Sequence, residues 1–223
     1  MKVIDLKGNG QVRISAIEMD VPYLGKTITF ILPLIGPDYH QNVMDSINNA
    51  KLSRPTTAQT LSLVDLALQN PKEVNCREVL TRFKENYLWT STEGLSFSDG
   101  YIAYDNMDGK MPQTSNELVK MLDAKDQRVR LVKPGFKTGY LPMNEFLKHP
   151  VLTAHVGEEM IPIVERVAKQ LNKNGGYVFA VDKSESDTKK LSAVDSGRYD
   201  VRLLLDGVFG DSLRGGYASG VRL

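Results

Sequence analysis

The sequence predicts an α+β fold of mixed, short antiparallel strands with two or more flanking helices and long loops. Three observations lead to this fold class. Residues 54–86 carry two helical patterns, residues 87–132 contain several short β-like runs bounded by glycine and proline, and residues 157–171 carry a third helical pattern. The 223 residues are assigned to a single domain.

The composition is that of an ordinary globular protein, with 41% hydrophobic and 25% charged residues. The formal net charge is +1, which removes the general electrostatic argument for a nucleic-acid partner. The densest basic stretch consists of Lys125, Arg128, Arg130, Lys133 and Lys137, and it is interrupted by Asp123 and Asp126. Arg128 and Arg130 alternate as on the solvated side of a strand, so we predict no binding of nucleic acid.

Residues 1–50 are predicted to form a hairpin and a lead-in to the domain. Val12–Ala16 alternates apolar and polar residues, and Thr27–Leu34 is a second β-like run after a turn at residues 24–26. The sequence Gly-Pro-Asp at residues 36–38 then breaks the chain.

Two helices are predicted next. Thr56 can cap the first, and Gln59, three residues later, completes a capping box. Leu61, Val64 and Leu68 fall on one face of this helix, which ends before Pro71. The second helix is expected from Cys76 to Asn86, with Val79, Leu80 and Phe83 facing the core.

The middle of the chain is predicted to be β-rich. Strands are expected at residues 87–92, 101–104 and 128–132, with turns at 94–100 and 105–109 and a short helix at 116–122. The later elements are a helical turn at 145–149, an amphipathic helix at 157–171, a strand at 177–181 and a polar loop at 183–190.

The segment 198–223 has an unusual pattern. An apolar stretch at 201–205 is followed by glycines at positions 207, 210, 215, 216 and 220, and no helix or strand period organises the residues between them. Glycine permits tight backbone conformations. We therefore predict a rigid loop scaffold, anchored by Leu203 and Leu205 and closed by a short last strand, that holds its other side chains toward solvent.

These outward side chains are the candidate ligand-binding residues. They are Tyr199, Asp200, Val208, Phe209, Asp211, Ser212, Leu213, Tyr217 and Ser219. Aromatic side chains give a large contact area with few rotors to freeze, while serine and glycine adapt to a partner. The alternative is that Phe209 and Tyr217 simply pack the loop onto the domain, as aromatic residues commonly do.

Two stretches resemble bacterial domains related to the formylglycine-generating enzyme. One is Arg-Pro-Thr-Thr-Ala-Gln at 54–59 followed by Leu-Ser-Leu-Val-Asp at 61–65. The other comprises Leu-Trp-Thr-Ser-Thr-Glu at 88–93, the run 101–106 with Gly109, and Val-Arg-Leu-Val at 129–132. The resemblance covers about residues 54–133 and implies a C-type-lectin-like fold. The apolar character of residues 61–68 and the long insert at 111–127 depart from that family.

The tail resembles another branch of the same fold. Arg-Leu-Leu-Leu-Asp-Gly at 202–207 and Gly-Gly-Tyr-Ala-Ser-Gly-Val-Arg-Leu at 215–223 look like the C-terminus of the variable proteins of diversity-generating retroelements, of an archaeal or viral type. In that family, rewritten C-terminal codons produce an exposed ligand-binding face on a fixed scaffold. The resemblance implies a receptor- or adhesin-like protein that binds a macromolecule, either a protein or a surface glycan.

Other chemistry finds little support. The single cysteine, Cys76, lies on a predicted helix and is interpreted as a buried, inert thiol, so no disulfide or zinc site is expected. The sequence contains neither a G-x-S-x-G motif nor a phosphate-binding loop. Asp105, Asn106 and Asp108 could hold calcium, but a turn favours the same residues. We expect no catalytic residue, metal or cofactor.

The sequence was searched for a signal peptide and for a segment that could span a membrane. Residues 1–10 have no apolar segment, and residues 28–35 are too few to span a bilayer. We expect a soluble chain without a signal peptide, and a cell-surface or virion location stays open. Two hypotheses of different class remain: a binding protein with a diversified C-terminal face, or an enzyme or sugar-binding module of the same fold with its site in loops 93–128. A third option is a structural subunit of a particle or surface layer.

Overall fold

The computed structural model describes residues 3–13, 18–97, 100–110, 112, 114–178, 188–195, 202–209 and 215–222. Its strands are β1 (Val3–Asp5), β2 (Gln11–Arg13), β3 (Glu18–Tyr23), β4 (Lys26–Asp38), β5 (Tyr87–Phe97), β6 (Gly100–Asp105), β7 (Val129–Val132), β8 (Gly139–Pro142), β9 (Gly175–Val178), β10 (Thr188–Asp195), β11 (Arg202–Phe209) and β12 (Gly216–Arg222). The helices are α1 (His40–Asn49), α2 (Thr57–Gln69), α3 (Val74–Glu85), α4 (Ser115–Asp123), α5 (Met143–Phe146), α6 (Pro150–Val156) and α7 (Ile161–Gln170), with a 3-10 turn, η1, at Glu158–Met160.

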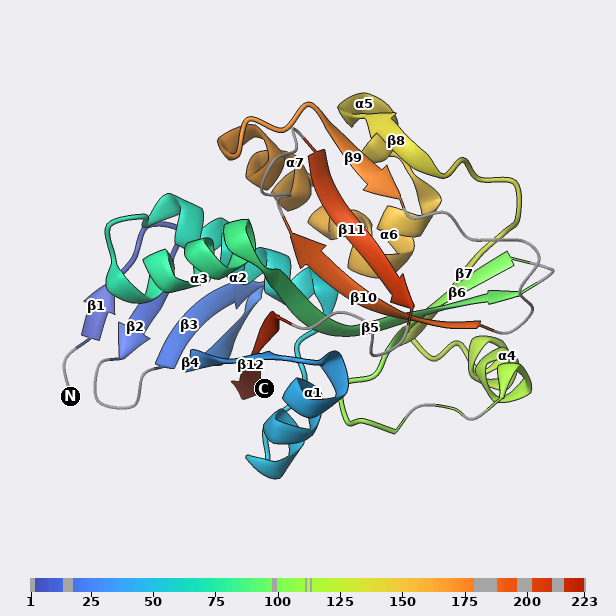
Figure 1. Ribbon diagram of the computed structural model, residues 1–223, viewed down its shortest axis with the longest axis horizontal. Coiled ribbons are helices and arrows are strands. Elements are labelled where there is room, and N and C mark those ends of the chain that lie inside the picture. Colours follow the sequence, from blue (N-terminus) through green and yellow to red (C-terminus); the bar gives the residue numbers. More distant parts are fainter. Residues whose placement is uncertain are drawn as a thin grey trace.

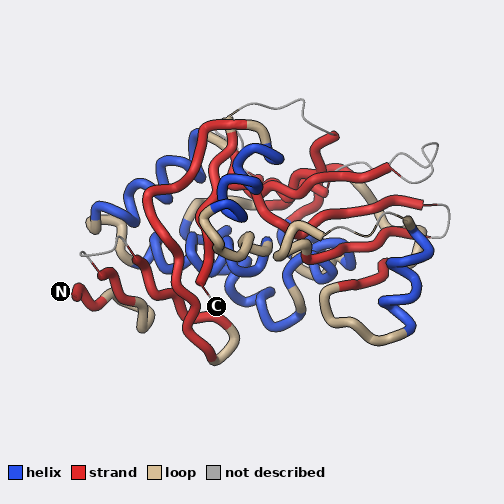
Figure 2. The backbone as a smooth tube through the Cα atoms, turned by 90° about the horizontal axis from the view of Figure 1, so that it is seen from below, coloured by secondary structure: helices blue, strands red, loops and turns tan. Residues whose placement is uncertain are grey.

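These strands join in one hydrogen-bonded sheet. Its main path runs β1-β2-β3-β4-β12-β5-β10-β11-β9-β8, and the β6–β7 pair branches from β5. Most neighbours are antiparallel, whereas β12 runs parallel to β5 and β11 runs parallel to β9. Figures 1 and 2 both place the C-terminal strand in the middle of the molecule and the N-terminal strands at one end.

Helices cover both faces of the sheet around β12. The main core is formed by apolar residues of β3, β4, α2, α3, α6 and α7 and includes Phe30, Leu61 and Phe83. A smaller core lies where α1 packs on β4 and β12, and it contains Met44, Trp89 and Ala218. Figure 1 shows α1 on the opposite side of the sheet from α2 and α3. The described strands β4 and β12 are therefore enclosed between helices.

The predicted helices 56–69 and 76–86 are confirmed. The Thr56 side chain accepts a hydrogen bond from the backbone N–H of Gln59, and the Gln59 side chain accepts one from the backbone N–H of Thr56, which completes the capping box. The predicted helix at 157–171 corresponds to η1 followed by α7. The strands predicted at 101–104 and 128–132 and the helix at 116–122 are also present, as β6, β7 and α4.

Several elements differ from the prediction. The N-terminal hairpin is formed by β3 and β4, so its first strand is residues 18–23 and not 12–16. The β4 strand runs through the Gly-Pro-Asp sequence at 36–38, which was predicted to break the chain after residue 34. Residues 94–97 belong to β5, and residues 188–190 of the predicted polar loop begin β10, because the two strands pair with each other. Helices α1 and α6 were not predicted.

The two motifs at 54–57 and 90–92 meet in a buried hydrogen-bonded cluster. The backbone N–H of Thr57 donates to Thr92 Oγ1 at 2.9 Å, and the Thr57 and Thr90 hydroxyls lie 2.9 Å apart. The backbone N–H of Ser91 donates to the carbonyl of Pro55 at 2.7 Å. These bonds satisfy polar groups that would otherwise be buried at a cost, and they fix the start of α2 against β5.

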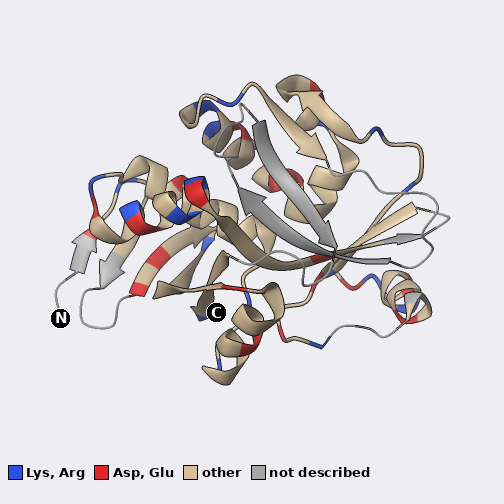
Figure 3. Cartoon of the chain, in the orientation of Figure 1, with Lys and Arg blue, Asp and Glu red and all other residues tan. Residues whose placement is uncertain are grey.

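Charged side chains of both signs are interspersed over the described part of the chain (Figure 3). No described helix is long and apolar enough to cross a membrane.

Candidate functional site

The strand that ends the described chain, β12, has neighbours on both of its edges. It pairs with β4 in an antiparallel arrangement and with the start of β5 in a parallel one. Ser53 adds an isolated bridge to Val221, with backbone N–O distances of 2.9 Å in both directions. Because both edges are paired and helices cover both faces, the residues of β12 from Gly216 to Val221 are all buried.

The prediction that Tyr217 and Ser219 face solvent is wrong. Only 6% of Tyr217 is exposed, and the Arg82 guanidinium lies over its ring with Cζ 4.4 Å from the centroid. Only 2% of Ser219 is exposed, and its hydroxyl donates to the carbonyl of Ile31 at 2.6 Å. The physical reason is the position of β12: Tyr217 belongs to the main core, while Ala218 on the other face packs under α1. These two residues are framework.

The glycines of β12 allow neighbouring side chains to pack closely against the strand. They were predicted to shape a loop. A Cβ atom on Gly216 would overlap the indole of Trp89, and one on Gly220 would overlap the side chain of Leu52. Among the described glycines at 215, 216 and 220, Gly215, which precedes the strand, has the left-handed backbone that favours glycine, with φ of +110°. The glycine-rich sequence therefore reflects a strand packed tightly between its neighbours.

The apolar stretch predicted as a loop anchor is the strand β11, which continues to Phe209. It lies between β10 and β9, and its last residues, Val208 and Phe209, are aligned with Leu191 and Lys190 of β10. The backbone of Leu203 and Leu205 pairs with Gly176 and Val178 in β9. The predicted contact residues Val208 and Phe209 thus lie at the end of an interior strand.

The other predicted contact residues, Tyr199, Asp200, Asp211, Ser212 and Leu213, lie outside the described residues. Their flanking strands are described. In the order of the sheet, β11 and β12 stand on opposite sides of the β5–β10 pair. Residues 210–214 therefore connect two interior strands, each of which is held by partners on both edges.

In the alternative site at loops 93–128, the oxygen-bearing side chains at 105, 106 and 108 make internal contacts. Asp105 pairs with the guanidinium of Arg130 at 2.7 Å and accepts a hydrogen bond from the Thr92 hydroxyl. The Asn106 amide donates to Glu93 and is buried, and Asp108 accepts from the backbone N–H of Lys110. Among the described residues there is no cluster of three His, Cys, Asp or Glu side chains that could hold a metal ion.

The thiol of Cys76 is buried in the main core. Burial, together with the nearby Glu73 carboxylate, raises its pKa to about 12. Because the thiolate is the nucleophilic form, this cysteine is inert at neutral pH.

The three histidines are bonded within the protein. His155 is buried, its Nε2 lies 2.5 Å from the Tyr101 hydroxyl, and burial lowers its pKa to about 3. His149 donates from Nε2 to the carbonyl of Lys137 at 2.8 Å and accepts at Nδ1 from the backbone N–H of Val151. His40 Nε2 donates to the carbonyl of Thr90 at 3.0 Å. His149 and His155 do not meet at a common metal ion.

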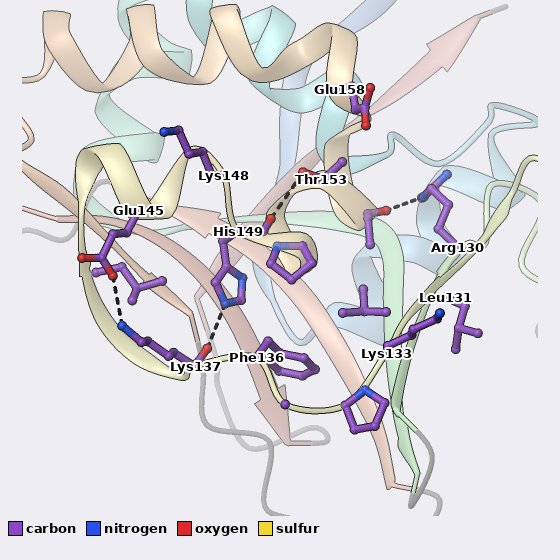
Figure 4. A pocket seen from close by; sticks show the side chains of 16 residues that line it. Arg130, Leu131, Lys133, Phe136, Lys137, Glu145, Lys148, His149, Thr153 and Glu158 are labelled. Carbon is purple, nitrogen blue, oxygen red and sulfur yellow. Dashed lines mark hydrogen bonds and ion pairs between the residues drawn. The ribbon is translucent and has the colours of Figure 1, made fainter.

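A cleft of about 800 Å³ lies between β7 with the segment that follows it and the helices α5 and α6 (Figure 4). It is lined by Arg130, Leu131, Val132, Lys133, Pro134, Gly135, Phe136, Lys137, Leu141, Glu145, Lys148, His149, Pro150, Thr153, Ala154 and Glu158. The cleft was not predicted from the sequence, although all of its lining residues lie between positions 130 and 158, because helix α6, which forms part of one wall, was not predicted. The only local signal was the basic run that includes Lys133 and Lys137.

Comparisons with known proteins bear on the fold. No model of a protein family matches the sequence, and no curated protein matches it. The chain is similar to a solved structure described as "Accommodation of massive sequence variation in Nanoarchaeota by the C-type lectin fold". The TM-score is 0.58, and the match covers 85% of this chain and 98% of the other. The chain has a C-type lectin fold.

Sequence identity to that structure is 16%, so the similarity is one of architecture. The C-type lectin fold predicted from the motifs at 54–133 and from the tail is confirmed. Within this C-type lectin fold, the predicted contact residues separate into two groups. Tyr217 and Ser219 are buried in β12, and Val208 and Phe209 end β11.

Proposed function

We propose that the protein binds a ligand through a diversified C-terminal segment carried on its C-type lectin scaffold, as the variable protein of a diversity-generating retroelement. The observation that carries the proposal is the position of the two strands, β11 and β12, between which residues 210–214 lie in the chain. The strands on both sides of this segment, β11 and β12, are interior strands of the sheet. A segment held in this way can change its side chains without changing the framework.

The solved structure of similar fold supports the proposal. It is described as accommodating massive sequence variation by the C-type lectin fold, and its chain is covered almost completely by this one. The stability cost of varying exposed side chains is also small enough for a segment to be diversified. Substitutions of exposed side chains away from structural features usually change stability by no more than ~0.5 kcal/mol.

The proposed contact set is smaller than the one expected from sequence. Tyr217 and Ser219 leave it because they are buried. The remaining members are Tyr199, Asp200, Val208, Phe209, Asp211, Ser212 and Leu213. This set combines aromatic and aliphatic contact area with short polar groups, a mixture that suits recognition of a macromolecule such as a protein or a surface glycan. In this proposal the protein has no catalytic role.

The test is the nucleotide sequence of codons 196–223 in several isolates. We expect substitutions at positions that are adenine in an imperfect repeat of these codons, the template copy, and we expect them to be concentrated at codons 199–200 and 208–213. The codons for Gly216, Tyr217 and Ser219 should be constant, because these residues pack against Trp89, Arg82 and Ile31. Substitutions scattered evenly along the gene, or frequent replacement of Gly216, would contradict the proposal.

A protein-level test uses alanine at Val208, Phe209, Asp211 and Leu213 together. The melting temperature of this variant should stay close to that of the wild type, while capture of the natural ligand is lost. A large fall in melting temperature would instead assign these side chains to the core.

A further inference from the structure

The cleft between β7 and the α5–α6 region has a charged rim over an apolar floor. Its lining contains four cationic residues and two acidic ones. Lys137 is paired with Glu145 at 3.4 Å, and Arg130 is paired with Asp105 at 2.7 Å. Lys133 and Lys148 are exposed and have no acidic partner within the described part of the chain. Counting partners among the described residues alone, the cleft carries two available positive charges, at Lys133 and Lys148, against one unpaired carboxylate at Glu158.

The floor of the cleft is apolar and held in place. Phe136 contacts Tyr101 and His149 edge-to-face, with ring centroids 6.4 Å and 5.8 Å apart. Figure 4 shows Phe136 and His149 between Lys133 on one side of the cleft and Glu145 and Lys148 on the other. Leu131, which also lines the cleft, is 49% exposed. A fixed aromatic floor loses little conformational entropy when an apolar group covers it.

The uncharged polar groups of the lining are already used. Both ring nitrogens of His149 bond to the backbone, and the Thr153 hydroxyl donates to the carbonyl of His149. The described lining therefore presents few uncharged polar side chains for hydrogen bonds to the hydroxyls of a glycan. What the cleft offers a ligand is ammonium groups and apolar surface, which together match carboxylates placed next to an apolar side chain.

We propose that this cleft is a second binding site, separate from the C-terminal segment, that takes an acidic peptide segment with an apolar side chain. The apolar side chain covers Phe136, and carboxylates on either side reach Lys133 and Lys148. Glu158 opposes the ligand's charge and so limits its affinity. The volume of about 800 Å³ is within the range of ligand-binding clefts and fits a few residues of an extended chain.

The experiment selects binders from a displayed library of random peptides about twelve residues long, which span roughly 40 Å when extended. The full-length protein is the target, and the double variant Lys133→Glu/Lys148→Glu is the counter-target. The matched control, Lys26→Glu/Lys84→Glu, makes the same charge change at exposed lysines outside the lining. We expect the peptides that require Lys133 and Lys148 to be rich in Asp and Glu around Leu, Phe or Ile.

The affinities of the selected peptides are then measured by fluorescence anisotropy. The Lys133→Glu/Lys148→Glu variant should bind them about tenfold more weakly or worse, and the control variant should bind them as the wild type does. Glu158→Gln should strengthen binding severalfold, and added salt should weaken it. Thermal melts confirm that each variant is folded.

Three results would overturn the proposal. They are a selection that yields no peptide dependent on Lys133 and Lys148, selected peptides without acidic residues, or equal weakening by the control variant. Peptides that bind the wild type and the cleft variant equally use another surface. Such peptides support binding by the C-terminal segment only if the alanine variant at residues 208–213 no longer binds them. The cleft proposal and the C-terminal proposal can therefore be contradicted independently of each other.

Discussion

The guanidinium of Arg82, on α3, lies over the ring of Tyr217, on β12, with Cζ 4.4 Å from the ring centroid. A cation over an aromatic face stabilises both groups, more so when they are shielded from water. The contact joins the C-terminal strand to a helix that is more than a hundred residues earlier in the chain, and it places Tyr217 in the framework.

Replacement of Tyr217 should therefore destabilise the protein. Tyr217→Ala removes a buried ring, and we expect it to lower the free energy of unfolding by about 3 kcal/mol or more. Urea unfolding measures the change. Tyr140→Ala is the matched control, since Tyr140 is 46% exposed, and it should cost about 0.5 kcal/mol. Equal effects of the two substitutions would show that Tyr217 does not belong to the core.

The ion pair between Asp65 and Arg166 gives a second prediction. Arg166 Nε and Nη2 each donate to a carboxylate oxygen of Asp65 at 2.8 Å, which ties α7 to α2, and the Asp65 side chain is only 8% exposed. Arg166→Met should cost about 2 kcal/mol, because it removes the charged donors of a buried carboxylate and leaves it the Gln69 amide, which donates to Oδ2 at 2.9 Å. Lys169→Met, which breaks an exposed pair with Glu165 on the same helix, should cost at most about 0.5 kcal/mol. Chemical denaturation of both variants tests the difference.

The stability of the protein should fall in acid partly because of His155. In the unfolded chain this imidazole takes up a proton near pH 6.5, whereas burial lowers its pKa in the folded protein to about 3. The unfolded state therefore binds more protons between these values, and stability is lost as the pH falls from 6.5 toward 3. One such group contributes up to about 1.4 kcal/mol per pH unit.

His155→Gln tests this assignment, because glutamine does not titrate and can still accept a hydrogen bond from Tyr101. The free energy of unfolding of this variant, measured by denaturant titration at several pH values, should depend less steeply on pH below 6.5 than that of the wild type. Parallel curves for the two proteins would show that His155 is not the group responsible.

The capping box at the start of α2 makes a local prediction. Thr56→Ala removes the acceptor for the backbone N–H of Gln59 and should cost about 1 kcal/mol. Thr56→Ser keeps the acceptor and should recover most of that loss. Thermal melts of both variants distinguish the cap from a simple packing effect of the methyl group, since only a packing effect would make the serine variant as unstable as the alanine variant.

Elements with local signals were predictable from the sequence. The α2 helix has a capping box, an apolar face and a terminating proline within fifteen residues of one another, and it was predicted almost to its ends. The α1 helix lacks such signals: Tyr39, at its N-cap, makes no side-chain capping bond. Its apolar residues Val43, Met44 and Ile47 are outnumbered by polar ones, so only packing against β4 and β12 identifies it.

Strand β3 was not predicted, because its acidic residues are stabilised by residues that are distant in the sequence. It carries the buried acidic residues Glu18 and Asp20, which do not fit an apolar alternation. Asp20 accepts a hydrogen bond from the Thr29 hydroxyl, and Glu18 pairs with Arg222 at 2.6 Å. The partner that makes Glu18 tolerable lies at the opposite end of the chain, so no local pattern could have indicated it.

The candidate site was predictable only in part for the same reason. The mixed residues at 208–219 look alike in sequence, yet Tyr217 and Ser219 are buried because β12 pairs with β4. Burial of these two side chains depends on contacts with Arg82 and Ile31, which are more than a hundred residues away. The cleft around Phe136 likewise needed the placement of α6, which carries no helix signal beyond Pro150.

The position of β12 between β4 and β5 has a consequence for biosynthesis. During translation, the two halves of the sheet are made first, and the strand that joins them emerges from the ribosome only after residue 222 has been added. Until β12 has been synthesised, the edges of β4 and β5 that it pairs with lack their partner. Assembly of the sheet therefore depends on long-range pairing, which is slow. A chain that ends before β12 would leave the gap between β4 and β5 unfilled, and we expect it to be cut by proteases more readily than the full-length protein.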